Sequence, residues 1–303
     1  MGSMRRYYRF SEYLKERFGE KVRRVCLDPG FPCPHKDPVS GAGGCVYCEG
    51  SSFSGSQMRG VSVREQLSSG IKASAAGGIK KHIAYFQNAT PTNAPAADLR
   101  RALEPIREFP SVVALAVSTR PDCVDGEKLD LIAEYAGDYD VWVEYGIQSA
   151  KNSTLHAIGR GHTFQQAENA MKMTAERGIK VAVHVILGLP GETKDDIINT
   201  AREISRLPVW GVKLHVLHVL EGTALARKYF KNEVPLFTME EYARVVCDFL
   251  ENVPGDCVVL RLVSDARGEK LIAPLWINDK IRAINLIDSE FARRRTCQGC
   301  AIE

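Results

Sequence analysis

Short runs of apolar, β-branched residues alternate along the chain with segments of helical periodicity. The apolar runs cover residues 22–27, 82–87, 112–118, 141–147, 181–187 and 212–220. Helical spacing of apolar positions recurs over 64–75, 96–107, 127–136, 165–177 and 195–206. Before the last of these helices, Thr193 and Asp196 stand at capping-box spacing. The alternation predicts an α/β fold with a parallel sheet, either doubly wound or a partial TIM-type barrel, with functional groups at the carboxyl ends of its strands.

The two ends of the chain differ from this central pattern. Residues 1–20 form a basic, aromatic arm, and 21–223 hold the alternating strands and helices. Residues 224–303 predict a helix at 238–252, a strand at 258–263 and a helix at 280–294. Because no clear linker or fixed-period repeat separates these parts, we expect one domain with appended ends, in which 224–303 closes the barrel.

Composition and charge exclude several classes of protein. Hydrophobic residues are 45% and charged residues 25% of the 303, and the net charge of +3 does not by itself imply a nucleic-acid partner. The chain has no apolar run long enough to span a membrane, and its first residues are too polar for a signal peptide. We therefore expect a cytoplasmic protein with no membrane contact.

Nine cysteines are the first sign of chemistry. In a chain that looks cytosolic, an odd number favours metal binding or catalysis over disulfides. Cys33, Cys45 and Cys48 lie in a long loop, 28–56, that follows the first strand and is rich in Gly, Pro and Ser. Loops of this length are usually functional. A tight turn between Cys45 and Cys48 would bring both thiols to the same side.

Two kinds of metal centre fit these three thiols. A zinc ion needs a fourth ligand, and the candidates are His35, Cys26, Cys297 and Cys300. A [4Fe–4S] cluster held by three cysteines keeps one iron open, and an open iron can bind a substrate or cofactor. The spacing of the thiols alone leaves both alternatives open.

The other motifs resemble the radical S-adenosylmethionine (SAM) superfamily over nearly the whole chain, from about Arg6 to Gly299. The resemblance is strongest to YhcC/YtqA-type members, and its motifs are LDPGFPCPHKD, GGCVYC, YFQNATPTNAP, STRPDC, VEYGIQS, GRGHT, GLPGET and LIAPLW. The gap between Cys33 and Cys45 is longer than the family's commonest spacing. Longer gaps are characteristic of the branch that includes the catalytic subunit of Elongator.

This resemblance implies a fold and a cofactor site. The fold is a partial (β/α)6 TIM-type barrel with an N-terminal helix and a C-terminal α/β extension. Cys33, Cys45 and Cys48 would hold a [4Fe–4S] cluster whose open iron binds SAM. The expected SAM contacts are Tyr47 at the adenine, Gln87 and Asn88 at the amino group, Gln148 and Arg160 at the ribose and carboxylate, and His184 at the ribose.

Several of these residues also have simpler interpretations. Glu144 stands in an apolar strand, which is costly unless the carboxylate is paired or bound, and we include it among the cofactor contacts. His184 could be a satisfied core histidine, and Asn88 could serve a turn. Arg120 and Asp122 fit an ion pair or a role at the barrel mouth. His215 and His218, three apart, should face opposite sides of a regular strand.

Both termini carry unassigned features. Residues 5–24 hold eight basic and three acidic side chains, interleaved with Tyr7, Tyr8, Phe10 and Tyr13. This mixture suits RNA binding, and it equally suits an amphipathic helix that packs its aromatic residues on the barrel. A second basic cluster, 293–295, could join an RNA surface. Cys297 and Cys300 form either an inert tail or a metal or redox pair.

We therefore expect an enzyme that reductively cleaves SAM to a 5′-deoxyadenosyl radical. The branch resemblance points to the C5 side chain of the tRNA wobble uridine as the substrate. The expected partners are then tRNA and an electron donor such as flavodoxin or ferredoxin. The alternatives are radical chemistry on a small molecule or peptide, and a non-catalytic, zinc-stabilised RNA-binding protein that uses Cys45, Cys48, Cys297 and Cys300.

Overall fold

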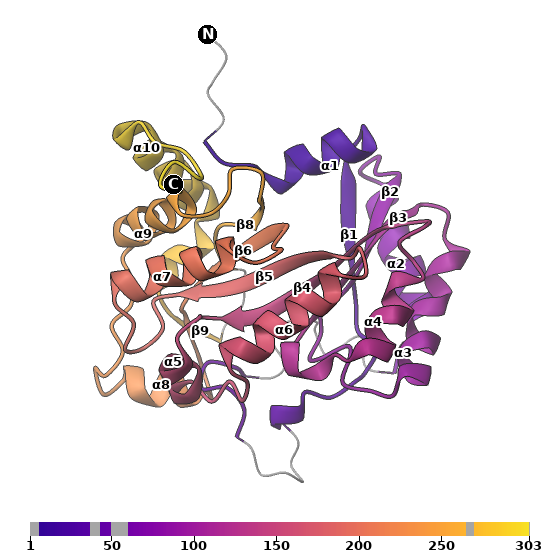
Figure 1. The fold of residues 1–303 in the computed structure, drawn as a ribbon, viewed down its shortest axis with the longest axis horizontal. Coiled ribbons are helices and arrows are strands. Elements are labelled where there is room, and N and C mark those ends of the chain that lie inside the picture. Colours follow the sequence, from indigo (N-terminus) through magenta and orange to yellow (C-terminus); the bar gives the residue numbers. More distant parts are fainter. Residues whose placement is uncertain (1–5, 37–42, 50–59, 265–269, 303) are drawn as a thin grey trace.

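A curled sheet of seven parallel strands forms the centre of the molecule (Figure 1). The computed structural model describes residues 6–36, 43–49, 60–264 and 270–302. The strands, in spatial order, are β1 (Val22–Leu27), β2 (Lys81–Phe86), β3 (Val112–Thr119), β4 (Asp140–Gln148), β5 (Lys180–Leu187), β6 (Gly211–Val216) and β8 (Val258–Arg261). This half-barrel confirms the α/β fold and the partial-barrel prediction.

Helices cover the outer face of the sheet along its whole width (Figure 1). They are α2 (Val63–Ala75), α3 (Ala96–Leu103), α4 (Gly126–Ala133), α6 (Phe164–Ala175), α7 (Lys194–Ser205) and α9 (Met239–Glu251). The last long helix, α10 (Lys280–Arg294), packs on α9, and the short helices α5 (Asn152–Ala157) and α8 (Ala224–Tyr229) lie together at one end of the sheet. The predicted capping box of Thr193 and Asp196 starts α7, and Thr238 and Glu241 start α9 in the same way. No helix in the described part of the chain is both long and apolar enough to cross a membrane.

The sixth apolar run does not form one strand. The sheet strand β6 ends at Val216, and Val219–Leu220 form β7, which pairs antiparallel with β9 (Leu271–Ala273). The predicted strand 212–220 is therefore wrong in its second half. The next strand at this edge of the sheet is β8, which belongs to the C-terminal extension and pairs with β6. The sheet thus has one more parallel strand than the six expected.

The amino-terminal helix α1 (Phe10–Phe18) packs its aromatic face on the amino ends of the strands. The Tyr13 ring lies 4.8 Å from the Trp210 ring, and the Phe10 ring lies 5.9 Å from the Trp142 ring. Tyr7 and Tyr13 are buried. These two residues are therefore not available for base stacking, and the packing interpretation of the arm is the one that the structure shows.

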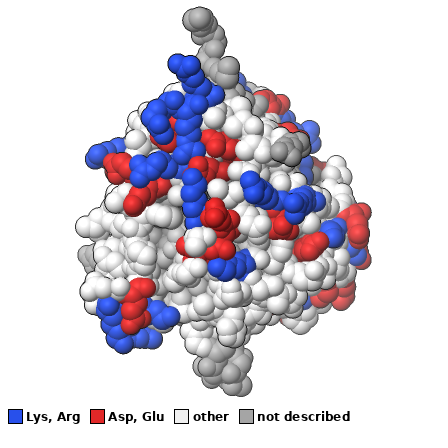
Figure 2. Space-filling model, turned by 60° about the vertical axis from the view of Figure 1, so that its left-hand side comes forward, with Lys and Arg blue, Asp and Glu red and all other residues white. Residues whose placement is uncertain are grey.

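The C-terminal turn is packed rather than frayed. Gln298 accepts a 2.9 Å hydrogen bond from the Tyr8 backbone and donates one of 2.7 Å to the Cys257 carbonyl, directly before β8. The basic cluster beside it is largely paired, because Arg293 bonds Glu290 and Arg294 bonds Asp248. On the face that Figure 2 shows, Lys and Arg side chains gather toward the upper part, and Asp and Glu side chains lie among them.

Candidate cofactor site

A cavity opens at the carboxyl ends of the strands, where the fold class predicts functional groups. It is lined by the cysteine loop and by residues from β2 to β8, and those from the strands and the turns after them include Tyr85, Gln87, Asn88, Thr90, Ser118, Thr119, Arg120, Gly146, Gln148, His184, Ile186, Lys213, His215, His218 and Arg261. The cavity thus lies at the edge of the sheet where the sequence predicts functional groups. Of the residues assigned to the cofactor from sequence, Glu144 does not line this cavity.

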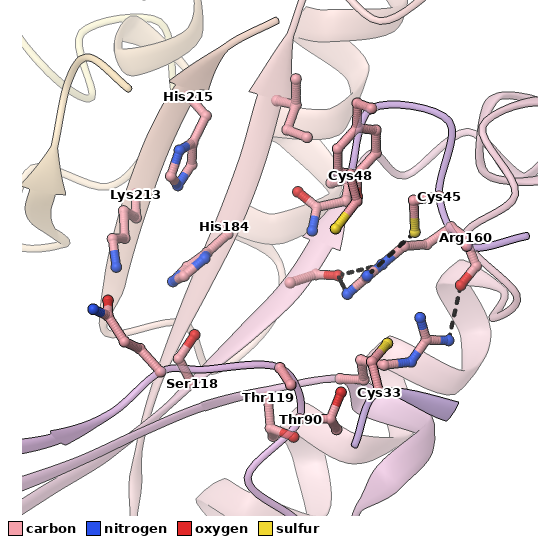
Figure 3. Close-up of a pocket in the computed structure, with 18 of the residues that line it drawn as sticks. Cys33, Cys45, Cys48, Thr90, Ser118, Thr119, Arg160, His184, Lys213 and His215 are labelled. Atoms are coloured by element: carbon pink, nitrogen blue, oxygen red, sulfur yellow. Dashed lines mark hydrogen bonds between the residues drawn. The ribbon is translucent and has the colours of Figure 1, made fainter. Parts of the chain in front are cut away.

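The three loop thiols all line this one cavity (Figure 3). The Cys48 N–H donates to the Cys45 carbonyl at 2.9 Å, which closes the tight turn expected between them. Backbone bonds fix this turn in place, since the Val46 N–H donates to Ile158 and the Val46 carbonyl accepts from Leu225. The turn is therefore held between α5 and α8. Residues 37–42 of the loop lie outside the described residues.

The candidate fourth ligands lie elsewhere. His35, Cys26, Cys297 and Cys300 are absent from the cavity lining. The His35 ring packs against Gly161, where an added Cβ would lie 1.8 Å from it. Within the described ranges, no three His, Cys, Asp or Glu side chains are placed to hold a single metal ion.

The zinc site built from two cysteine pairs is wrong. Gln298, between Cys297 and Cys300, bonds the residues just before β8, at the amino edge of the sheet. Cys45 and Cys48 lie at the carboxyl edge. Three thiols on one cavity, with none of the candidates His35, Cys26, Cys297 and Cys300 in its lining, fit a [4Fe–4S] cluster with an open iron.

Arg160 lies beside the thiols in a fixed, buried position. Its Nη2 donates to the Gly146 carbonyl at 2.6 Å, its Nε donates to the same oxygen at 3.0 Å, and its Nη1 approaches Cys45 Sγ at 3.7 Å. Gly146 leaves room for two side chains here, because an added Cβ would lie 2.7 Å from Arg160 Nη2 and from Gln148 Nε2 and would displace both. Gln148 itself has φ of 69°, a costly conformation for a non-glycine residue that concentrates at functional sites.

The loop after β2 connects the sheet to the cysteine loop. The Asn88 side chain donates a short hydrogen bond to Asp28, and Asn93 donates to the Pro32 carbonyl at 2.9 Å. Gln87 and Asn88 line the cavity as expected, but the Asn88 amide is already used to hold the start of the cysteine loop. Thr90, which the sequence did not single out, has a buried hydroxyl with no hydrogen-bond partner among the described residues.

Two more side chains have buried polar atoms at this cavity. The Tyr47 hydroxyl and Arg120 Nη1 have no hydrogen-bond partner in the described part of the protein. Arg120 otherwise forms the expected ion pair with Asp122, at 2.9 and 2.8 Å, and donates to the Arg160 carbonyl at 2.8 Å. Since buried donors are normally satisfied, these atoms mark places where a bound group would supply partners.

Glu144 is the centre of a buried polar network. Its carboxylate accepts hydrogen bonds from the Tyr85 hydroxyl (2.8 Å), Trp142 Nε1 (2.9 Å), His184 Nε2 (2.6 Å) and Lys213 Nζ (2.8 Å). Burial alone would raise the pKa of Glu144, but Lys213 and His184 hold it well below the usual range. The Glu144 carboxylate is therefore paired, as a charged group in an apolar strand has to be. His184 contacts this carboxylate and also lines the cavity.

Lys213 is the main residue that sequence reasoning missed. It lines the cavity, its side chain is 2% exposed, and its Nζ also donates to the Tyr85 hydroxyl at 2.6 Å. Burial lowers the pKa of Lys213 to about 7. The signal was present, because a lysine within the apolar run VKLHV is as costly as Glu144 within its own strand.

His215 and His218 do not face opposite sides, contrary to expectation. Both line the cavity, because β6 ends at Val216 and His218 lies in the connection to β7, where strand alternation no longer applies. The His215 ring lies 5.4 Å from the His184 ring. His215 Nε2 is buried with no hydrogen-bond partner among the described residues.

The fold and the thiol-lined cavity together define a class, and the family comparison agrees. The radical SAM superfamily model matches residues 41–204, and a radical SAM C-terminal domain model matches 209–293. The chain belongs to the radical SAM superfamily.

Its similarity to individual proteins spans the whole chain. It is 33% identical to YtqA of Bacillus subtilis (strain 168) over 299 residues, covering 97% of this chain and 92% of YtqA. It is 34% identical to protein YhcC of Escherichia coli (strain K12) over 294 residues, covering 97% and 94%. The expected YhcC/YtqA-type relationship is confirmed.

More distant similarity reaches the Elongator branch. The structure of archaeal Methanocaldococcus infernus Elp3 matches with a TM-score of 0.67 at 18% identity, covering 91% of this chain and 64% of that one, and so shares the fold. A tRNA uridine(34) acetyltransferase of Methanocaldococcus jannaschii is 28% identical over 177 residues, covering 57% of this chain and 31% of its own length.

Proposed function

We propose that this protein is a radical SAM enzyme that binds a [4Fe–4S] cluster through Cys33, Cys45 and Cys48. The observation that carries the proposal is that these three thiols line one cavity, while none of the four candidate fourth ligands named from the sequence lines it. A bound cluster would supply one electron for the reductive cleavage of SAM into methionine and a 5′-deoxyadenosyl radical, which would abstract hydrogen from the substrate.

The chain's own residues bind and orient the cofactor. Arg160 is locked on the Gly146 carbonyl beside Cys45, so that its guanidinium can meet a carboxylate without reorganisation. Tyr47 and Thr90 bring buried hydroxyls without partners among the described residues, and Gln148 brings an amide held in a strained backbone conformation. We assign these four side chains, with Gln87 and His184, to SAM. The aromatic plug of α1 keeps water out of the opposite end of the barrel.

The substrate class is the finer part of the proposal. We propose tRNA, with chemistry on the C5 side chain of the wobble uridine. The support is the partial similarity to tRNA uridine(34) acetyltransferases and the shared Elp3 fold. Flavodoxin or ferredoxin would supply the electron. A cytoplasmic location suits such a chain, whose described cysteines form no disulfide.

The cluster assignment is tested by anaerobic reconstitution with iron and sulfide. The protein should turn brown, bind four irons per chain as the [4Fe–4S] assignment requires, and form 5′-deoxyadenosine from SAM under dithionite. Cys33→Ala should abolish both the colour and the cleavage. Cys300→Ala is the matched control, because that thiol is exposed and lies at the other edge of the sheet. Intact SAM cleavage in Cys33→Ala would show that the assignment is wrong.

The tRNA proposal needs a separate experiment. Nucleosides of tRNA from a deletion strain and from its parent are compared by mass spectrometry. A wobble-uridine modification that is lost in the deletion strain, and restored by the wild-type gene but not by Cys33→Ala, supports the proposal. An unchanged nucleoside profile would remove tRNA and leave radical chemistry on a small molecule or peptide.

A further inference from the structure

The inner part of the cavity differs in chemistry from the part that carries the thiols. In Figure 3, Ser118, His184, Lys213 and His215 lie on one side, and Cys33, Cys45 and Cys48 lie on the other. We call the first group, together with Tyr85 and Arg261, the inner wall; all six line the cavity. The inner wall comes entirely from strands of the sheet, which hold their side chains more rigidly than loops do.

Basic side chains gather at the inner wall. Lys213 and Arg261 belong to it, and the Arg24 guanidinium lies 5.5 Å from the centre of the Tyr85 ring. The Glu144 carboxylate contacts the wall, where His184 and Lys213 share it. Arg24 Nε and Nη2 are buried with no hydrogen-bond partner in the described part of the chain. The Arg24 guanidinium thus adds positive charge next to the wall.

The electrostatic effect on Lys213 points the same way. Burial is the largest cause of the lowered pKa of Lys213, and Arg261 and Arg24 lower this pKa as well. The Glu144 carboxylate raises it, and the resulting pKa is about 7. Burial and the neighbouring Arg261 also place the pKa of His215 well below its usual range. The Glu144 carboxylate thus does not restore the ordinary pKa of Lys213, which a second anion beside the amine would raise.

Hydrogen-bond donors are available for such an anion. Lys213 has three N–H bonds, and two of them are used by the Tyr85 hydroxyl and the Glu144 carboxylate. His215 Nε2 is buried without a partner among the described residues. A neutral imidazole can carry its proton on this nitrogen and donate it.

We propose that the inner wall binds an oxyanionic group of the substrate, a carboxylate or a phosphate, through Lys213 and His215. This inference rests on the proposed function in one respect, namely that the substrate enters the cavity of the thiols. A substrate held by its anionic end at the inner wall extends toward the thiols, and its reacting carbon is thereby directed at the cofactor.

The test measures anion binding to the reconstituted protein with SAM bound, so that the cofactor contacts are already occupied. Malonate and inorganic phosphate are titrated separately by calorimetry, which distinguishes a carboxylate from a phosphate preference. At least one of them should bind in one equivalent and more tightly at about pH 6 than at about pH 8, because the protonated amine of Lys213 is the binding form. The groups that face this amine, and that share in its titration, are Arg24, Tyr85, Glu144, His184, His215 and Arg261.

Two variants make the result specific. Lys213→Met alone would leave the Glu144 charge buried, so Lys213→Met is combined with Glu144→Gln to remove both charges with similar shapes. This double variant should weaken anion binding by at least about tenfold, since hydrogen bonds to charged groups are lost. Lys180→Met is the matched control. Lys180 also lies on a strand and pairs with a buried aspartate, Asp140, but it lies at the amino end of the barrel, away from the cavity. Its anion affinity should equal that of the wild type.

Unchanged binding in a folded double variant would overturn the proposal, because the anion would then lie elsewhere. Absence of binding of either probe to the wild type at concentrations on the order of 10 mM would also overturn it. The proposed function is judged independently on the same preparation by 5′-deoxyadenosine formation. SAM cleavage without anion binding refutes only this inference, and anion binding without SAM cleavage refutes only the proposed function.

Discussion

The pairing of Glu144 with Lys213 predicts a pH-dependent loss of stability when the carboxylate is removed. Glu144→Gln replaces one accepting oxygen with an amide N–H₂, although four donors point at the carboxylate. At least one buried donor then loses its acceptor, at a cost of about 1–3 kcal/mol. This part of the loss should not depend on pH, because it concerns geometry and not protonation.

A second part of the loss comes from the proton on Lys213. In the wild type the folded pKa of Lys213 is about 7, so the amine gains most of a proton as the pH falls from about 8 to about 6. In Glu144→Gln the attraction of the carboxylate is gone, and the pKa falls further, which leaves the amine neutral throughout this range. The unfolded chains bind the same number of protons here. The destabilisation should therefore be larger at about pH 6 than at about pH 8, by about 1 kcal/mol.

Urea unfolding followed by circular dichroism, under anaerobic conditions, measures both parts. The same substitution in a Lys213→Met background is the control, because without the amine the pH-dependent part should vanish. Any contribution from the cofactor cancels in the difference between matched pairs of variants. An equal loss at both pH values in the wild-type background, or an unchanged pH dependence in Lys213→Met, would refute the reasoning.

Three further predictions test other parts of the structure. In equilibrium dialysis, Gly146→Ala should weaken SAM binding about tenfold or more, because its Cβ would displace Arg160 and Gln148. Gly137→Ala is the control and should bind SAM normally, because Gly137 has open space around it. Gly70→Ala should lower the free energy of unfolding in urea by about 1–3 kcal/mol despite the helix preference of alanine, because the new Cβ would lie 2.4 Å from Val25. Ser69→Ala, on the exposed face of α2, should leave it unchanged. His184 alone should account for up to about 3 kcal/mol of the stability lost as the pH drops from 6.5 to about 4, because burial lowers its pKa to about 4 and the unfolded chain takes up the proton first. His156→Gln, at an exposed site, should leave the pH profile unchanged.

The architecture was largely readable from the sequence because its strands and helices have strong local signals. Apolar runs coincide with β1 to β5, and the capping box at Thr193 marks the start of α7 within one residue. The division of the sixth run was not readable. Leu217 and His218 continue the apolar pattern, yet the chain leaves the sheet after Val216 to pair with β9, a contact more than 50 residues away in sequence. Such nonlocal pairing leaves no trace in the local periodicity.

The candidate site was readable only where a motif or an anomalous residue marked it. The thiol spacing identified Cys33, Cys45 and Cys48, and a charge in an apolar strand identified Glu144. The sequence did not predict the hydrogen-bond partners of Glu144, because Tyr85, His184 and Lys213 come from three other strands. Their convergence depends on the order and register of the sheet, which no single segment encodes.

The position of this network follows from the alternation of strand residues and from the helix that closes the barrel. Trp142 and Glu144 are two residues apart on β4, as are Gly211 and Lys213 on β6, and each pair therefore faces the same side of the sheet. The first member of each pair lies toward the amino ends of the strands, where Tyr13 and Trp210 exclude water. The charged member lies one layer above, between this dry plug and the cavity. These side chains are closed off from water on the α1 side and meet only what occupies the cavity, so a charged group that enters from the thiol side should shift their pKa values. The aromatic face of α1, which the sequence left between an RNA surface and a packing element, thus forms the dry boundary beneath the inner wall.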